Sequence, residues 1–127
     1  MNLFEKFEHG ALALPGKNTD FSSIAWTPHP KFEGVELKHL ITSQDTNDAF
    51  SYHLVRIAPG KKIGLHSHGT QLETHEVIAG TGVCNTAGEE LAYEEGVISI
   101  LPAGIPHEVL ADDKGLYLFA KFMPALC

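Results

Sequence analysis

The chain has 127 residues, of which 43% are hydrophobic and 20% are charged, a composition that predicts one globular domain with its own apolar core. Nine lysines and arginines against 16 aspartates and glutamates give a net charge of −7. We therefore expect no nucleic-acid partner, because phosphate contacts need a basic surface. We also expect no membrane partner, since the sequence has no basic amphipathic segment and no apolar run of about 20 residues.

The compartment is predicted from the cysteines and from the start of the chain. Cys84 and Cys127 are the only two cysteines, and a structural disulfide to the last residue would be unusual. Both are therefore expected to be free thiols in a reducing environment. Residues 1–16 carry early acidic residues and no continuous apolar segment of the kind found in signal peptides. The prediction is a cytoplasmic protein.

The first 34 residues are expected to form an arm and initial strands that pack on a barrel made by residues 35–127, within one domain. Leu3, Phe4 and Phe7 share one helical face, so residues 2–12 are predicted as a short helix or an arm that packs on a neighbour. The segment 15–30 contains two proline turns and is predicted as loops around a short strand.

The remainder of the chain alternates short β-branched and apolar segments with turn sequences. The turns are marked by glycine, proline and aspartate, as in Pro59-Gly60 and Asp112-Asp113-Lys114-Gly115. This rhythm, without any long amphipathic helix, predicts an all-β sandwich or barrel. The expected strands are 35–42, 50–58, 73–79, 83–85, 90–93, 97–101, 107–111 and 116–122.

Eight histidines are the one excess in the composition, and two of them form the pair His66-Ser67-His68. Side chains two residues apart on a strand point to the same face, so these imidazoles could bind a single ion. The spacing by itself is a weak signal, because a pair of surface histidines satisfies it equally well.

The residues around this pair resemble the two sequence motifs of the cupin superfamily. The first motif, G-x5-H-x-H-x3–4-E-x6-G, is matched at every fixed position by GKKIGLHSHGTQLETHEVIAG, from Gly60 to Gly80. The second, G-x5-P-x-G-x2-H-x3-N, is matched by GVISILPAGIPHEVLA from Gly96, except that Ala111 replaces the final asparagine. The resemblance implies an all-β double-stranded β-helix, which is a jelly-roll barrel.

The same resemblance implies that His66, His68, Glu73 and His107 are metal ligands. Three neutral imidazoles and one carboxylate suit Fe, Mn, Ni, Zn or Cu, and leave open positions on an ion that prefers five or six ligands. A divalent ion with one carboxylate leaves the site near +1, which favours an anionic or oxygen-bearing ligand. Gln71 is a weaker alternative to Glu73, because a carboxylate binds a dication better than an amide does.

Three further residues are candidates for binding or catalysis. His75 lies two residues after Glu73 on the same strand, so it is expected to face the ion as a catalytic general base, a fifth ligand or a hydrogen-bond donor to Glu73. Tyr52 and Arg56 share one face of the preceding strand, and His53 takes the other. If their face is inward, Tyr52 and Arg56 could bind substrate, with the guanidinium pairing with a carboxylate; a sheet-edge or dimer contact is the alternative.

Two classes of function follow from the resemblance. One is a metal-dependent enzyme, of the dioxygenase, isomerase or lyase type, that acts on a small oxygenated or carboxylate-bearing molecule. The other is a non-catalytic cupin that binds or senses a small ligand. The family also commonly pairs two barrels through an edge strand, so we expect a homodimer to which the Leu3, Phe4 and Phe7 arm contributes.

Overall fold

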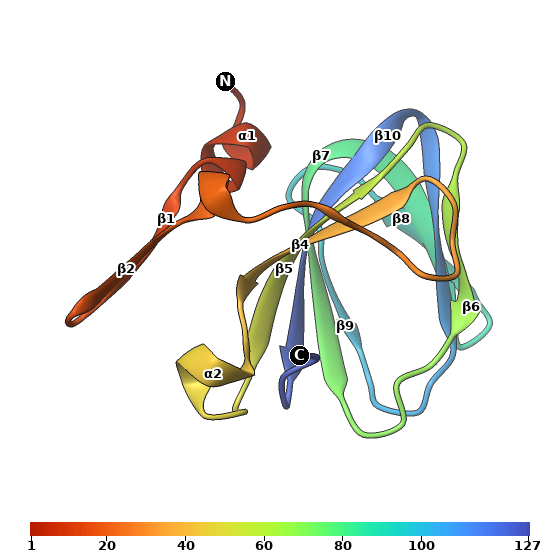
Figure 1. Ribbon diagram of the computed structural model, residues 1–127. Helices are drawn as coiled ribbons and strands as arrows, with labels where there is room; N and C mark the ends of the chain where they lie inside the picture. Colours follow the sequence, from red (N-terminus) through yellow and green to blue (C-terminus); the bar gives the residue numbers. More distant parts are fainter.

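The computed structural model describes residues 1–127, and the chain forms an antiparallel β-barrel with a separate N-terminal segment on one side (Figure 1). None of its helices has the length and apolar character that a membrane-crossing helix requires. The helical elements are α1 (Leu3–Glu8), the 3-10 turn η1 (Phe21–Ser23) and α2 (Ser43–Thr46). The strands are β1 (Ala11–Leu14), β2 (Lys17–Asp20), β3 (Thr27–Pro28), β4 (Val35–Ile41), β5 (Ser51–Ile57), β6 (Lys62–His66), β7 (Leu72–Thr86), β8 (Glu89–Tyr93), β9 (Ile98–Leu101) and β10 (His107–Met123).

Two long strands hold the barrel together. The main sheet has the order β3-β4-β5-β10-β7-β8, while β6 also pairs with β10 and β9 with β7. β7 has 15 residues and β10 has 17, so each pairs with different strands along its length. β7 pairs with β9 and then with β8, and β10 pairs with β6 and then with β5, while the two long strands also pair with each other. This arrangement removes most free sheet edges and confirms the expected jelly-roll barrel.

Both long strands bend where the sequence analysis predicted turns. The register between them shifts between Ala111 and Leu116, opposite Gly80 and Gly82. A Cβ atom at Gly80 would collide with the backbone oxygen of Gly115, and Gly80 has a φ of 77°, so glycine is needed at this crossing. The prediction of separate strands on either side was therefore wrong: the glycines mark a bulge within continuous strands.

Apolar residues form two clusters, one inside the barrel and one outside it. The inner cluster has 14 buried residues, among them Val109, Leu116 and Leu118. The outer cluster lies between the N-terminal segment and the outer face of the sheet, and consists of Phe4, Phe21, Leu40, Leu54 and Phe119. Consequently the central part of the sheet, including β5, is covered on both faces.

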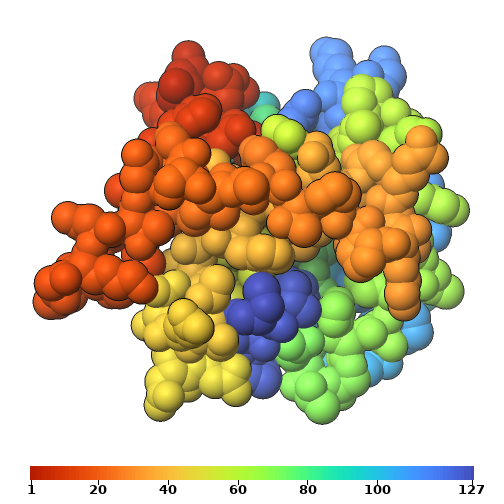
Figure 2. Space-filling model, in the orientation of Figure 1, coloured from red at the N-terminus to blue at the C-terminus, as the bar shows by residue number.

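The N-terminal segment packs on its own barrel. Residues 3–8 are helical as predicted, whereas residues 11–20 form the β1–β2 hairpin, which spans the end of the predicted arm (2–12) and the start of the segment predicted as loops around a short strand (15–30). Phe4 is buried against the ring of Tyr117, with ring centroids 5.0 Å apart, while Leu3 stays exposed. Figure 2 shows the orange part of the segment continuing across the front of the barrel.

Candidate metal centre

The four predicted ligands come from three strands and one loop that meet at one end of the barrel. His66 ends β6 and is paired with His107, the first residue of β10. Glu73 is the second residue of β7, and His68 lies in the loop between β6 and β7. A hydrogen bond from the Gly104 amide to the His68 carbonyl (2.8 Å) fixes this loop. The expected strand geometry of the histidine pair thus holds for His66 but not for His68.

The structure brings these four side chains together into a group that could hold a metal ion. One donor atom from each of His66, His68, Glu73 and His107 lies within 4.8 Å of the others. The Oε1 atom of Glu73 is 3.2 Å from His107 Nε2 and 3.7 Å from His68 Nε2. The His66 and His107 rings are adjacent, with centroids 4.4 Å apart. Gln71, the alternative to Glu73, instead donates its amide hydrogen bond to the Ala125 carbonyl (3.0 Å).

Backbone carbonyls orient two of the imidazoles. The Nδ1 atom of His66 is 2.7 Å from the Gly64 carbonyl, and that of His107 is 3.4 Å from the Ile105 carbonyl. Because a carbonyl can only accept, each Nδ1 carries the hydrogen and each Nε2 keeps a free lone pair. This is the second interaction that metal-binding histidines normally make.

Two buried atoms in the group have no hydrogen-bond partner. They are Glu73 Oε1 and His107 Nε2, on side chains that are 5% and 2% exposed. An unpaired buried polar atom costs about 1–3 kcal/mol, and here two such atoms face each other. Both are electron-pair donors, so a cation between them would satisfy both. The residues therefore fit a metal ion chemically.

The local electrostatics favour the metal-binding protonation states of Glu73 and His66. Burial by itself raises the pKa of the Glu73 carboxyl, but the surrounding imidazoles, among them His75 through its hydrogen bond, outweigh it and hold that pKa well below its ordinary value. Burial lowers the pKa of His66, which the hydrogen bond to Gly64 only partly offsets. At neutral pH Glu73 is therefore an anion and His66 a neutral ligand.

His75 makes two hydrogen bonds that account for both of its ring nitrogens. Its Nε2 is 2.6 Å from Glu73 Oε2 and its Nδ1 is 2.8 Å from the Tyr93 hydroxyl. Since an ionised carboxylate only accepts, Nε2 donates to Glu73 and Nδ1 accepts from Tyr93. Burial raises the pKa of Tyr93, so its hydroxyl keeps the proton it donates. Of the three roles considered for His75, this geometry favours the donor to Glu73.

A cavity of about 270 Å³ is lined by three of the four predicted ligands, His66, His68 and Glu73. Neither lysine nor arginine lines it, so a bound cation would be its only permanent positive charge. Two histidines that the sequence analysis left without a role, His29 and His39, also line it. Their positions depend on how the N-terminal segment and β4 pack, and no motif marks them. Tyr93 was missed for the same reason, since 18 residues separate it from His75.

Comparison with known proteins now identifies the family. The model of the cupin domain matches residues 53–119, which is more than half of the chain. The chain belongs to the cupins. A relative at 26% identity over 76 residues is an oxalate-binding protein of Thermotoga maritima; the match covers 59% of this cupin and 63% of the relative, less than two thirds of its length.

Solved structures agree on the fold of this cupin. A predicted oxalate decarboxylase of Thermotoga maritima superposes with a TM-score of 0.72 at 23% identity, over 81% of this chain and 95% of that chain. KdgF of a Halomonas species superposes with a TM-score of 0.69 at 18% identity, over 79% and 86%. An RmlC-like cupin of Shewanella frigidimarina gives a TM-score of 0.70 at 17% identity, over 83% and 87%.

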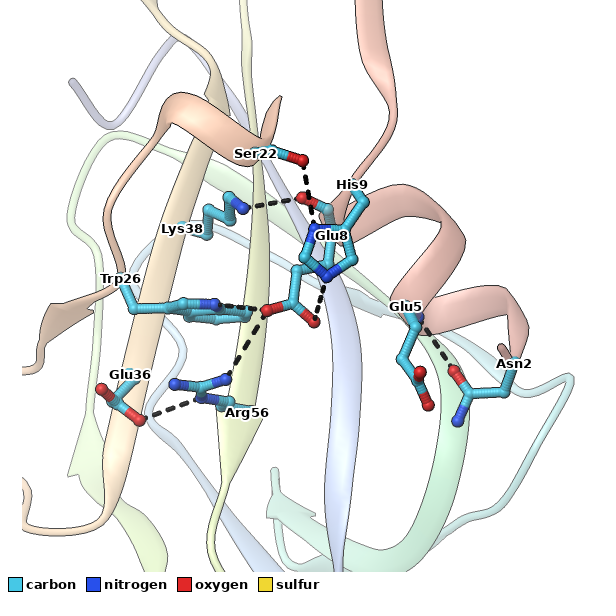
Figure 3. A network of polar contacts seen from close by, with 9 residues as sticks. All are labelled: Asn2, Glu5, Glu8, His9, Ser22, Trp26, Glu36, Lys38 and Arg56. Carbon is cyan, nitrogen blue, oxygen red and sulfur yellow. Dashed lines mark hydrogen bonds and ion pairs between the residues drawn. The ribbon is translucent and has the colours of Figure 1, made fainter. Parts of the chain in front are cut away.

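Tyr52 and Arg56 do not line the cavity of this cupin, because their face of β5 points outward. Figure 3 shows Arg56 held among residues of the N-terminal segment and β4. Its Nε is 2.9 Å from Glu36 Oε1, and its guanidinium lies 4.0 Å from the centre of the Trp26 ring. Glu8, which accepts a 2.9 Å hydrogen bond from Trp26 Nε1, completes the group. Arg56 thus fastens the N-terminal segment to the barrel, and the prediction that it faces substrate in this cavity does not hold.

Tyr52 lies instead in a second and larger hollow of the cupin. This open groove of about 720 Å³ runs between the N-terminal segment and the outer face of the sheet, and 13 of its 17 lining residues are hydrophobic. The Tyr52 ring packs near Phe119, with Lys121 Nζ 4.6 Å from its centre. None of the four predicted ligands lines this groove. Although the groove is larger than the cavity beside the ligands, it is therefore not the candidate metal site.

Proposed function

We propose that this cupin binds a small carboxylate, of the size of oxalate, through a divalent transition-metal ion held by His66, His68, Glu73 and His107. The observation that carries the proposal is the buried facing pair of partnerless donor atoms, Glu73 Oε1 and His107 Nε2, which lie 3.2 Å apart beside a cavity that Glu73, His66 and His68 line. The donor set suits Fe, Mn, Ni, Zn or Cu, and four protein ligands leave one or two positions for a further ligand.

The charge and size of the cavity support a small anion as that ligand. A divalent ion with the Glu73 carboxylate and three neutral imidazoles leaves the centre near +1. Because lysine and arginine are absent from the lining, anion binding would depend on the ion. The volume of about 270 Å³ is below the roughly 300–1,000 Å³ of sites that hold drug-sized ligands. The name of the oxalate-binding relative from Thermotoga maritima points to the same ligand class.

The role we infer for His75 is to position Glu73, not to remove a proton from substrate. A general base needs a free nitrogen that faces the reacting molecule, and both nitrogens of His75 are engaged. The ordered series Tyr93, His75, Glu73 then fixes the carboxylate so that its Oε1 faces the cavity. When bound, the ion would supply Lewis acidity toward an oxygen of the ligand.

Catalysis of the dioxygenase, isomerase or lyase type remains one form of this proposal, and binding or sensing without turnover is the other. The engaged nitrogens of His75 favour binding, because the remaining candidate for proton transfer, His29, lies on the cavity wall outside the ligand group. The Nδ1 of His29 accepts a hydrogen bond from the Lys31 amide (3.1 Å), so the neutral ring carries its hydrogen on Nε2 and could donate it. If the cupin turns its ligand over, His29 is the residue we expect to move the proton.

Calorimetric titration with oxalate tests the proposal. Metal-loaded protein is expected to bind oxalate, whereas metal-free protein and metal-treated His107→Ala are expected not to bind it. Equal binding to the metal-free protein would overturn the proposal, and so would equal binding to His107→Ala. Oxygen consumption and product analysis on the loaded protein, with oxalate and a panel of small dicarbonyl compounds, then separate the enzyme from the binding protein.

We also propose that the cupin forms a homodimer, as the family resemblance implied, but through the outer groove instead of an edge strand. Leu3, Phe7 and Ile98 border that groove and are 57%, 38% and 68% exposed. Sedimentation of the wild type against Ile98→Glu tests this, with a dimer expected for the first and a monomer for the second.

A further inference from the structure

A second group of metal-binding side chains lies outside the four predicted ligands. His39 in β4, His53 in β5 and Cys127 at the end of the described chain each offer a donor atom, and these atoms lie within 4.8 Å of one another. His39 and His53 are direct partners in the β4–β5 register. We propose that this cluster is a distinct site for a thiolate-binding ion of the zinc type.

The two imidazoles are arranged so that their Nδ1 atoms share one hydrogen, which a metal ion would replace. Their Nδ1 atoms are 2.7 Å apart and the rings are nearly perpendicular. The other nitrogen of His53, Nε2, is 2.7 Å from the Ser51 hydroxyl, which is fully buried. If Nε2 donates to Ser51, the Nδ1 lone pair of His53 points at His39. A second interaction of this kind orients a metal-binding histidine.

The cysteine is held beside them by the backbone of the last residues. The Leu126 amide donates to the Ser51 hydroxyl (2.8 Å), the same hydroxyl that contacts His53. The Ser43 amide donates to the Cys127 carbonyl (2.6 Å), and the Ala125 amide donates to the Asp48 carbonyl (3.3 Å). Figure 2 shows these dark blue residues seated between the yellow segment around α2 and the green segment beyond β6. The thiol is therefore fixed at the cluster even though the residue is exposed.

The donor set defines the ion. Two neutral imidazoles and one thiolate suit Zn²⁺ and related borderline ions, whereas the first centre has no sulfur. Two nitrogens on one tetrahedral zinc, each at about 2.0–2.1 Å, lie roughly 3.3 Å apart, so His39 needs to move outward by about half an ångström. On binding, the thiol releases its proton to solvent and the His39 hydrogen moves from Nδ1 to Nε2. A water molecule would complete the fourth position.

The site is separate from the first centre. The Phe122 ring stands between them, with its centre 5.6 Å from the His53 ring and 5.1 Å from the His68 ring. Both groups nevertheless border the same cavity, since His39 and His68 line it together. The inference uses none of the residues on which the proposed function rests, so either can fail without the other.

Cobalt titration of the metal-free, reduced and untagged protein tests the second site, because Co²⁺ bound to a thiolate gives a sulfur-to-cobalt charge-transfer band in the near ultraviolet. The wild type is expected to show this band and to bind two equivalents of Co²⁺. Cys127→Ser is expected to lose the band and one equivalent. The matched control Cys84→Ser, which alters a buried thiol elsewhere, and His107→Ala, which alters the first centre, are both expected to keep the band.

The same titration can overturn the inference. A wild type without the band refutes it, as does a band that survives in Cys127→Ser or disappears in Cys84→Ser. His39→Gln provides a second variant on a different element, and an undiminished band in that protein also refutes the site. Circular dichroism spectra of each variant verify that the barrel is folded.

Discussion

Replacing Tyr93 by phenylalanine removes one oxygen atom from the series that ends at the candidate metal centre. The Tyr93 side chain is 1% exposed, and its hydroxyl is 2.8 Å from His75 Nδ1. The phenylalanine ring fills the same space, so the change leaves packing intact and leaves the buried Nδ1 without a partner. His75 is then free to rotate away from Glu73, to which it donates a 2.6 Å hydrogen bond.

The size of the effect follows from these contacts. An unsatisfied buried acceptor costs about 1–3 kcal/mol, so the free energy of unfolding of the metal-free protein is expected to fall by that amount. Loss of a residue that orients a ligand typically weakens metal binding about 10- to 100-fold. At saturating metal this removes a further ~1.4–2.7 kcal/mol of stabilisation. The loaded protein should therefore lose about 2–6 kcal/mol in total.

Urea unfolding of metal-free and metal-loaded Tyr93→Phe, together with a competitive metal titration against a chromophoric chelator, measures both quantities. Tyr52→Phe is the matched control, since its ring lies on the outer face of β5 and its hydroxyl makes no hydrogen bond. Its free energy of unfolding should stay within about 0.5 kcal/mol of the wild type. The reasoning fails if Tyr93→Phe matches the wild type in both metal affinity and stability.

Three further outcomes are expected. His107→Ala should abolish metal uptake at the first centre yet keep a cooperative thermal transition, because the barrel core lies elsewhere. Elemental analysis measures the uptake, and Co²⁺ spectra distinguish the first centre from the second site. Full uptake at the first centre would contradict the ligand set. Arg56→Ala should lower the free energy of unfolding by about 0.5–1.5 kcal/mol, since the side chain is 35% exposed and its removal loses an ion pair and a cation–π contact. The same change should leave oxalate affinity unaltered. A loss of affinity in calorimetry would indicate that Arg56 contacts the ligand. Iodoacetamide should modify Cys127 but not Cys84 in native metal-free protein, because Cys84 is fully buried whereas Cys127 is exposed. Mass spectrometry showing a modified Cys84 before unfolding would be inconsistent with this structure.

The sequence by itself predicted the β-barrel and the group of side chains at its mouth. The expectation of an all-β sandwich or barrel rests on local information, since alternating apolar residues define strands and glycines and prolines mark where the chain bends. The jelly-roll topology and the ligand group rest on the resemblance to the two cupin motifs. His66, His68, Glu73 and His107 fill the fixed positions of two motifs, so the convergence of these residues could be predicted before any contact was known.

Which face of a strand points inward was decided only by the tertiary structure. On β5, alternation separates Tyr52 and Arg56 from His53, but both faces of this strand are covered, one by the barrel and one by the N-terminal segment. Hydrophobicity therefore gives no preference between the faces. The packing of Trp26 and Glu8 on Arg56 settles the matter, and those residues are far away in the sequence.

Partnerships between distant residues were also beyond the reach of the sequence. His75 meets Tyr93 although the strand register pairs Tyr93 with Gly82 and His75 with Ser99. Cys127 meets His39 and His53 because hydrogen bonds hold the last residues against β5 and α2. The spacing of these residues follows no helix or strand period. The sequence thus specified the donor types of the first centre, while chain folding decided which groups orient them and whether a second set of donors meets at all.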